Sequence, residues 1–125
     1  MPVILQVNFD WDLGEEELRP YSNANSAKLF WTVPGLLWKI WVRDPETRAS
    51  GGIYLFKDRA SAQAYKDGPI AAAVRRFPKS SNHRFQIYDV REDQTAITGG
   101  PVDVEMKRGE VPPEVKEMLA KMAGK

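Results

Sequence analysis

The sequence has no cysteine and only one histidine, His83, among its 125 residues. Without cysteine the chain cannot form disulfides, thiolate nucleophiles, cysteine-ligated zinc sites or iron–sulfur clusters. A lone histidine also excludes the zinc and non-haem iron sites that need several imidazoles. We therefore expect no metal, and any chemistry must use one imidazole, carboxylates, amides, hydroxyls and aromatic rings.

A charge of one sign and long apolar runs are missing too. Lys and Arg number 18 and Asp and Glu 17, so the formal charge is +1 and no net field attracts nucleic acid. No run approaches the roughly 20 apolar residues of a membrane span, and the N-terminus does not resemble a signal peptide. Gly51-Gly52 and Gly99-Gly100 lack the strand–loop–helix context of a phosphate-binding loop. We expect a cytoplasmic protein that binds no nucleotide cofactor, nucleic acid or membrane.

The residues that are present fit one globular domain, since 42% of them are hydrophobic. Four segments have the alternating pattern that predicts strands: Val3–Phe9, Leu36–Arg43, Ile53–Lys57 and Phe85–Arg91. In the second segment the alternation places Leu36 and Trp38 on one face together with Ile40 and Val42. Both faces of this segment carry large apolar groups, so we expect it to be covered on both sides.

Two helical regions separate these strands. The first covers residues 12–31 with a kink at Pro20, and the second covers residues 58–77 with an interruption at Gly68 and Pro69. The resulting order is strand, helix, strand, strand, helix, strand. This order predicts an α+β protein with the ferredoxin-like βαββαβ fold, in which helices cover one face of an antiparallel sheet.

A C-terminal extension follows this fold. We assign residues 1–93 to the ferredoxin-like domain and residues 94–125 to the extension. Alternation of Val102, Val104 and Met106 with charged residues predicts a strand at 102–107, and an apolar stripe predicts an amphipathic helix at 113–123. The extension docks either on its own subunit or on a partner, and the pattern does not choose between them.

Two motifs in the central hairpin resemble a known family. Residues 34–41 read PGLLWKIW and residues 51–56 read GGIYLF, as in the YdhR-like monooxygenases of the dimeric α/β-barrel superfamily, which also holds the antibiotic-biosynthesis and quinol monooxygenases. The resemblance implies a homodimer in which the bare faces of two sheets pack together, with a pocket between sheet and helices in each subunit. It also implies a cofactor-independent monooxygenase that oxidises an aromatic or polycyclic small molecule with molecular oxygen.

Such a reaction needs an apolar pocket, a base for a phenolic proton and a donor for the developing oxyanion. Asn8 is one catalytic candidate, because a mid-strand amide can donate to a substrate oxygen; alternatively it bonds a neighbouring side chain or faces water. His83 is the other, because its ordinary pKa of about 6.5 suits a general base. We expect His83 in a loop over residues 79–84, where the alternative is a solvated surface residue.

Four further residues are candidates for substrate binding. Gln6 shares the face of Asn8, and Trp38 either stacks on a substrate ring or fills the core. Tyr54 and Tyr88 either bind a phenolate or anchor the sheet. Alternation does not say which faces of different strands align, so a single pocket that contains these side chains is a hypothesis.

Two other functions remain open from the sequence. One is a non-catalytic dimeric module that binds a hydrophobic metabolite. The other is an isomerase or dehydratase that uses His83. An apolar pocket without inward-pointing polar groups would favour the first, and loss of activity in His83→Ala would favour the second.

Overall fold

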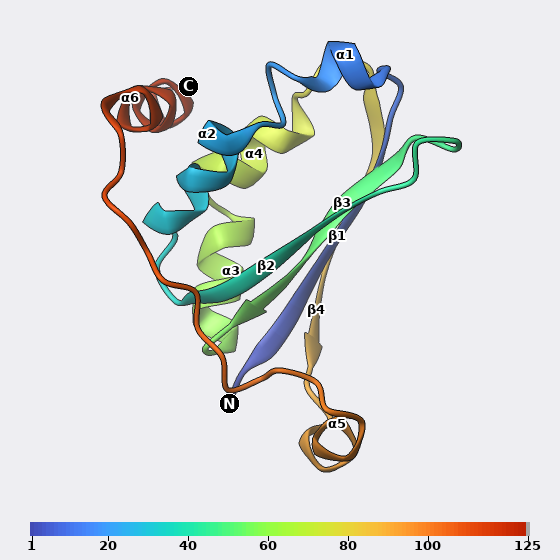
Figure 1. Ribbon diagram of the computed structural model, residues 1–125, viewed down its shortest axis with the longest axis vertical. Helices are drawn as coiled ribbons and strands as arrows, with labels where there is room; N and C mark the ends of the chain where they lie inside the picture. The colour runs from blue at the N-terminus through green and yellow to red at the C-terminus, as the bar shows by residue number, and fades with distance from the viewer. Residues whose placement is uncertain (125) are drawn as a thin grey trace.

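A computed structural model describes residues 1–124 and shows one antiparallel sheet with helices packed on one of its faces (Figure 1). The four strands are β1 Val3–Trp11, β2 Leu36–Arg43, β3 Ala49–Phe56 and β4 Ser80–Asp89. Their order in the sheet is β2-β3-β1-β4, so β1 is central and pairs with both β3 and β4. This arrangement confirms the predicted ferredoxin-like fold.

The first helical region is divided into three short pieces: α1 Glu15–Leu18, α2 Ala24–Lys28 and the 3₁₀ helix η1 Leu29–Thr32. Pro20 lies in the break between α1 and α2, as the missing backbone donor of proline predicts. Asn23 begins α2, because its side chain accepts hydrogen bonds from the backbone amides of Asn25 and Ser26 at 3.0 and 3.1 Å.

The second helical region contains α3 Arg59–Lys66 and α4 Pro69–Arg75. The carboxylate of Asp58 caps α3 by accepting a hydrogen bond from the amide of Ser61 at 2.8 Å. Gly68 and Pro69 separate the two helices, as predicted, with proline in the first turn of α4.

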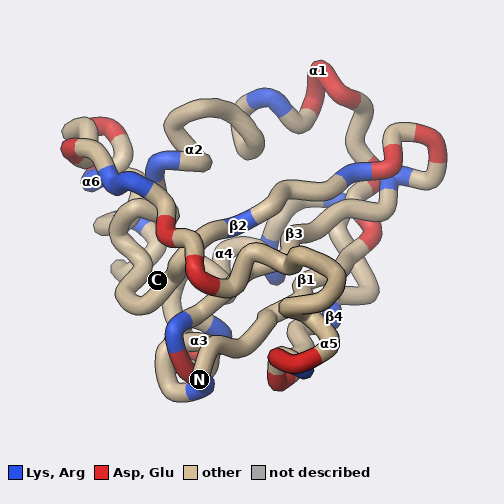
Figure 2. Tube along the Cα trace, turned by 60° about the horizontal axis from the view of Figure 1, so that its bottom comes forward, with Lys and Arg blue, Asp and Glu red and all other residues tan. Residues whose placement is uncertain are grey.

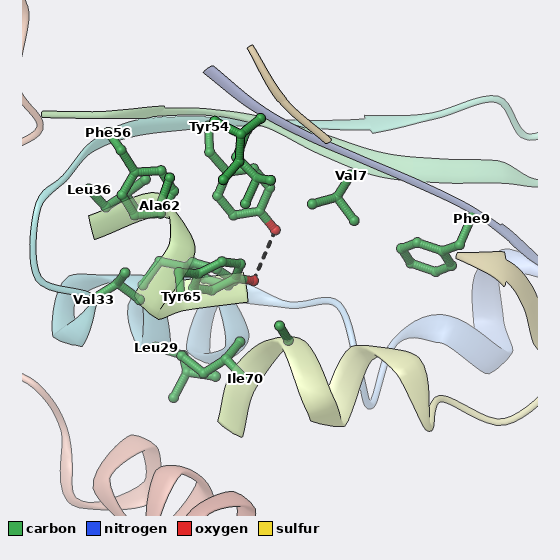
Figure 3. Close-up of a cluster of buried hydrophobic side chains, with 14 of the residues drawn as sticks. Val7, Phe9, Leu29, Val33, Leu36, Tyr54, Phe56, Ala62, Tyr65 and Ile70 are labelled. Carbon is green, nitrogen blue, oxygen red and sulfur yellow. Dashed lines mark hydrogen bonds between the residues drawn. The ribbon is translucent and has the colours of Figure 1, made fainter. Parts of the chain in front are cut away.

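The core lies between the helices and one face of the sheet, and Figure 3 shows part of it. In β1 the odd-numbered residues are buried on this face: Val3, Leu5, Val7, Phe9 and Trp11. The even-numbered residues of β1 face the other way, because successive side chains of a strand alternate. We call the two sides of the sheet the helix face and the open face.

The edge strand β2 differs from its predicted alternation. Leu36 is opposite Phe56 and Trp38 is opposite Leu55, so one extra residue, Leu37, is accommodated between two successive pairs. Such a bulge turns the following side chains to the other side of the sheet. Leu36 is therefore fully buried on the helix face while Trp38 lies on the open face, and the prediction that they share a face was wrong.

The strand β4 begins at Ser80, so the loop predicted over residues 79–84 was wrong as well. The pairing of β1 with β4 shifts between Asn8 opposite Arg84 and Asp10 opposite Ser81, which leaves an extra residue in β4. Asn82 has a φ of 55° at this point, a conformation that asparagine tolerates better than most residues. The bulge lets the strand continue where the polar sequence suggested a loop.

The C-terminal extension also departs from the prediction in part. Residues 92–98 form helix α5 (Glu92–Thr98), which was not predicted, and residues 102–107 do not form the predicted strand. In this segment the amide of Met106 donates to the carbonyl of Leu37 at 2.7 Å, and the bulge there offers no regular edge for a longer ladder.

The last helix, α6 (Pro113–Ala123), has the bounds that the sequence predicted. It packs on α4, α2 and η1 of its own chain, and its Val115 is fully buried in the core. The segment that leads to it runs past the N-terminus and along β2 (Figure 1). The division into a domain at 1–93 and an extension at 94–125 stays a prediction.

The surface carries charges of both signs, distributed along the chain (Figure 2). The first turns of α1 and α5 are acidic, whereas basic residues occur along β2 and in α6. Within residues 1–124 there is no helix with the length and apolar character needed to cross a bilayer.

Candidate functional site

A cavity of about 280 Å³ lies between the helix face of the sheet and the helices. Its wall draws on the first three strands and on α1, α2, η1, α4 and α6, and its apolar residues include Val7, Phe9, Trp11, Leu18, Leu29, Phe30, Trp41, Tyr54, Ile70, Val74, Phe77, Met118 and Met122. Concave, mostly apolar sites with few polar groups are typical of small-molecule binding. The cavity has the location that the family resemblance implies.

One end of the cavity is a rigid aromatic cluster. The rings of Trp11 and Phe77 stack with centroids 4.6 Å apart and planes inclined by 7°. Tyr21 lies against both, at 5.9 and 5.6 Å. The indole N–H of Trp11 donates to the carbonyl of Pro78 at 3.1 Å, which fixes the orientation of the ring.

At another part of the wall, the ammonium nitrogen of Lys39 is surrounded by aromatic rings. Its Nζ lies 3.3 Å from the ring centroid of Trp41, 3.7 Å from that of Phe30 and 4.6 Å from that of Tyr54. Ring faces attract cations at such distances. Among residues 1–124 the side chain makes no ion pair or hydrogen bond. Desolvation by burial lowers the pKa of Lys39 well below its usual value.

The second cationic side chain of the wall, Arg43, is fully engaged. Its guanidinium donates to the carbonyls of Trp11 and Leu13 at 3.1 and 2.6 Å, to Ser50 Oγ at 2.9 Å and to Glu15 Oε2 at 3.1 Å. These bonds tie the start of the first helical region to the sheet. Arg43 therefore stabilises the cavity wall. Its N–H groups are already used in these bonds, whereas the amine of Lys39 is not.

Tyr54, one of the three aromatic residues around Lys39, is paired with a second tyrosine behind the cavity wall. The hydroxyls of Tyr54 and Tyr65 are 3.2 Å apart and share a hydrogen bond, which Figure 3 marks with a dashed line. Desolvation raises the pKa of both phenols, and each phenol also influences the other. Both hydroxyls therefore stay protonated at neutral pH and can donate a hydrogen bond.

Of the six site residues predicted from the sequence, Tyr54 is part of the cavity wall. Gln6, Asn8 and Tyr88 lie on the open face, around a separate shallow depression that also includes Arg84. The structure therefore does not bring Asn8 and Tyr54 together. The roles assigned to Gln6, Asn8 and Tyr88 stay predictions, for a surface on the opposite side of the sheet from the cavity.

Trp38 also lies on the open face, because of the bulge at Leu37. Its indole N–H donates to the carbonyl of Pro101 at 2.8 Å, so the ring holds the C-terminal extension instead of lining the cavity.

His83 lies beside the cavity without being part of its wall. Its ring stacks on Phe9 with centroids 5.2 Å apart, and its Nε2 is 3.0 Å from Ser80 Oγ. Desolvation and the positive charge of Arg75 lower the pKa of His83, although the backbone of Val74 acts in the other direction. The lowered pKa favours the neutral imidazole, and His83 contacts the cavity wall through the ring of Phe9 and the backbone of Val74.

The sequence reasoning did not single out Lys39, although a signal for it was present. Lys39 stands between Trp38 and Ile40 in a strand that was expected to be covered on both faces. A lysine in such a strand must either reach solvent at an exposed edge or be buried, which is rare for a charged side chain. This conflict between residue type and environment is typical of functional sites.

For metal binding, residues 1–124 contain no group of three or more histidine, aspartate or glutamate side chains arranged to hold an ion.

The family comparison agrees with this geometry. A family model described as "Putative mono-oxygenase ydhR" matches residues 4–101, which include the sheet apart from its first residue, Val3, and the helices up to α5. The chain belongs to this family. The match ends before α6, so the part of the cavity wall that comes from Met118 and Met122 lies outside the region shared with the family. No curated protein matches the chain significantly.

Proposed function

We propose that this member of the family is a cofactor-independent monooxygenase that oxidises an aromatic or polycyclic small molecule with molecular oxygen. The observation that carries the proposal is the aromatic-lined cavity between sheet and helices in a chain of a mono-oxygenase family. Its volume of about 280 Å³ is just below the range of about 300–1,000 Å³ found for small-molecule pockets. A compact aromatic substrate fits this size best.

The reaction uses the electron-rich character of an ionised substrate. For an anthrone, the methylene carbon loses both hydrogens and gains one oxygen atom to become a carbonyl, and the second oxygen atom leaves with those hydrogens as water. The apolar wall reduces the contact between the ionised substrate and water. Tyr54 contributes its ring to the cavity wall, and its hydroxyl is held by the hydrogen bond with Tyr65.

Oxygen uptake tests this function. Purified protein is incubated with a panel of hydroquinones and anthrones, and uptake above a heat-denatured control is expected for at least one compound. Ala73, whose methyl lines the cavity, is changed to Phe to occupy the cavity, and uptake should fall sharply. The exposed Ala60→Phe is the matched control and should leave uptake unchanged. Absence of uptake over the whole panel contradicts the proposal.

We further propose that the protein is a homodimer formed through the open face. The support is the exposure of large apolar side chains there: Ile40, Val42 and Tyr88 are 49%, 39% and 51% exposed in the single chain. Ile40→Lys should convert the dimer to monomers in sedimentation experiments. Ala120→Lys, on the exposed side of α6, adds the same charge and should leave the dimer intact. A wild-type protein that sediments as a monomer contradicts this part.

A second candidate function is a non-catalytic module that binds a hydrophobic metabolite. The observation in its favour is that Asn8 and His83, the two predicted catalytic residues, are absent from the cavity wall. Quenching of tryptophan fluorescence by aromatic compounds, because Trp11 and Trp41 line the cavity, reports binding separately from turnover. Binding without oxygen uptake over the panel would favour this function over the first.

A further inference from the structure

We propose that Lys39 is the base that deprotonates a phenolic substrate in the cavity, and that the resulting ammonium group holds the phenolate. This inference rests on the proposed function and specifies its substrate class: an aromatic compound with an acidic hydroxyl group. It also assigns the base for which His83 was the sequence candidate.

The position of Lys39 makes its nitrogen available to a ligand. The bulge at Leu37 turns Lys39 to the helix face, where it lines the cavity. Every fully buried side-chain nitrogen or oxygen in residues 1–124 has a hydrogen-bond partner. The Nζ of Lys39 has no such partner among these residues, so it is not sealed in the core and stays open to the cavity.

The other ionisable groups around the cavity are already engaged. Arg43 and Glu15 bond each other at 3.1 Å, and Arg43 is further held by backbone carbonyls. The hydroxyls of Tyr54 and Tyr65 bond each other. The remaining ionisable side chain of the wall, Tyr21, packs in the aromatic cluster at the other end. Within residues 1–124, Lys39 is thus the cationic side chain of the wall that lacks an acceptor, and an acidic ligand oxygen would supply one.

The environment of Lys39 keeps its amine available as a proton acceptor. Desolvation lowers the pKa of Lys39, and the three surrounding rings offset part of this effect because they stabilise the ammonium form. A phenol has an ordinary pKa of about 10, close to that of an unperturbed lysine. Because its lowered pKa makes Lys39 a weaker base than such a lysine, the attraction between phenolate and ammonium in the apolar cavity must make up the difference.

In the proposed step the phenolic O–H bond breaks and an N–H bond forms on Nζ. The oxygen keeps the electron pair, and no electron is gained or lost. The neutral pair of phenol and amine becomes a phenolate–ammonium pair, whose attraction is strong in an apolar cavity. The phenolate is the electron-rich form that the oxygenation requires.

Binding of 2-naphthol tests the step without turnover, because its absorption moves to longer wavelength when it ionises. In neutral buffer the free probe is un-ionised, and we expect the probe bound to the wild-type protein to show the naphtholate spectrum. Lys39→Met should bind it as the neutral naphthol with an affinity about tenfold or more weaker. Lys107→Met, at an exposed lysine of the extension, is the control and should behave as wild type.

Lys39→Arg separates a base from a simple anchor, because arginine keeps the charge and cannot accept a proton. This variant should release a full proton to the buffer for each naphtholate bound. The wild-type protein should release less, and progressively less as the pH rises through the pKa of Lys39. Equal release by the two proteins at every pH overturns the role as base. A neutral spectrum of naphthol on the wild-type protein overturns the whole inference.

These outcomes are distinct from those for the proposed function. If naphtholate forms at Lys39 but no substrate causes oxygen uptake, the proposed monooxygenase function is contradicted and the role of Lys39 as a base is supported. Oxygen uptake that survives in Lys39→Met at the wild-type rate contradicts the base and leaves the monooxygenase in place.

Discussion

The two faces of the sheet differ in what they can do, although they are built from neighbouring residues of the same strands. The helix face is covered by helices and contains an aromatic cavity in which the amine of Lys39 has no hydrogen-bond partner among residues 1–124. The open face carries the amides of Gln6 and Asn8 together with partly exposed apolar side chains. The sequence analysis selected these amides as site residues. The cavity, however, is lined by the neighbouring residues of the same strand, whose side chains lie on the helix face. A polar residue in a strand therefore says little about a site until its face is known.

The largest expected difference between the two faces is the loss of stability caused by introducing a charged side chain. Leu5 is fully buried on the helix face and Gln6 follows it on the open face. Leu5→Asp should lower the free energy of unfolding by about 3 kcal/mol or more, because it places an unpaired charge in the core. Gln6 is only half-buried, so Gln6→Asp should lower it by much less than Leu5→Asp does. Urea denaturation of both variants measures this, and similar losses would refute the assignment of faces.

The next effect concerns catalysis at Lys39. A base with a lowered pKa is active in its neutral form, so the oxygen-uptake rate should rise with pH through the pKa of Lys39 and then level off. Lys39→Met should lower the rate by about a hundredfold and abolish this rise. Steady-state rates measured over a pH series provide the check. A pH profile that is the same in Lys39→Met would show that another group titrates.

A smaller effect distinguishes two tyrosines on opposite faces. Tyr54→Phe leaves the buried hydroxyl of Tyr65 without its partner and should cost about 1–2 kcal/mol of folding free energy. Tyr88 is 51% exposed on the open face, and Tyr88→Phe should cost less than about 0.5 kcal/mol. Thermal unfolding monitored by circular dichroism is sufficient for this comparison. Equal shifts in melting temperature would speak against the buried hydroxyl pair.

The smallest effect is expected at His83. Because the pKa of His83 is lowered in the folded state, the unfolded chain binds more protons in mildly acidic solution. The wild-type protein should therefore lose some stability as the pH falls through the ordinary histidine pKa towards the folded-state value. His83→Ala should lack this loss and keep the oxygen-uptake rate. A large drop in the oxygen-uptake rate would instead support the sequence prediction that His83 is the catalytic base.

The fold could be predicted because its signals are local and regular. Alternation in β1, the cap at Asp58 and the interruption at Gly68 and Pro69 each have a direct physical meaning, and the bounds of α6 followed from its apolar stripe. The order of these elements then leaves few topologies open. The cytoplasmic location expected from the sequence stays a prediction.

The positions of Trp38, Lys39 and His83 could not be predicted to the same extent, because they depend on two bulges. Leu37 and the region of Asn82 each add one residue to a strand, and nothing in their side chains announces it. One extra residue reverses every later side chain, which moved Trp38 to the open face and Lys39 to the cavity. Which side chains of two neighbouring strands lie on the same face depends on the hydrogen-bonded register between the strands. The residue pattern of one strand does not contain this information.

The C-terminal extension connects the two faces mechanically. Pro101 accepts a hydrogen bond from Trp38 on the open face, Arg108 donates to the carbonyl of Leu36, and α6 adds Met118 and Met122 to the cavity wall. The residues that contact Trp38 and the methionines that line the cavity therefore belong to one continuous segment, which we call the strap. If association through the open face shifts this strap, ligand affinity must change, and ligand must change the association constant by the same factor. Variation in the part of the extension after residue 101, which the family match does not include, is then enough to change both properties.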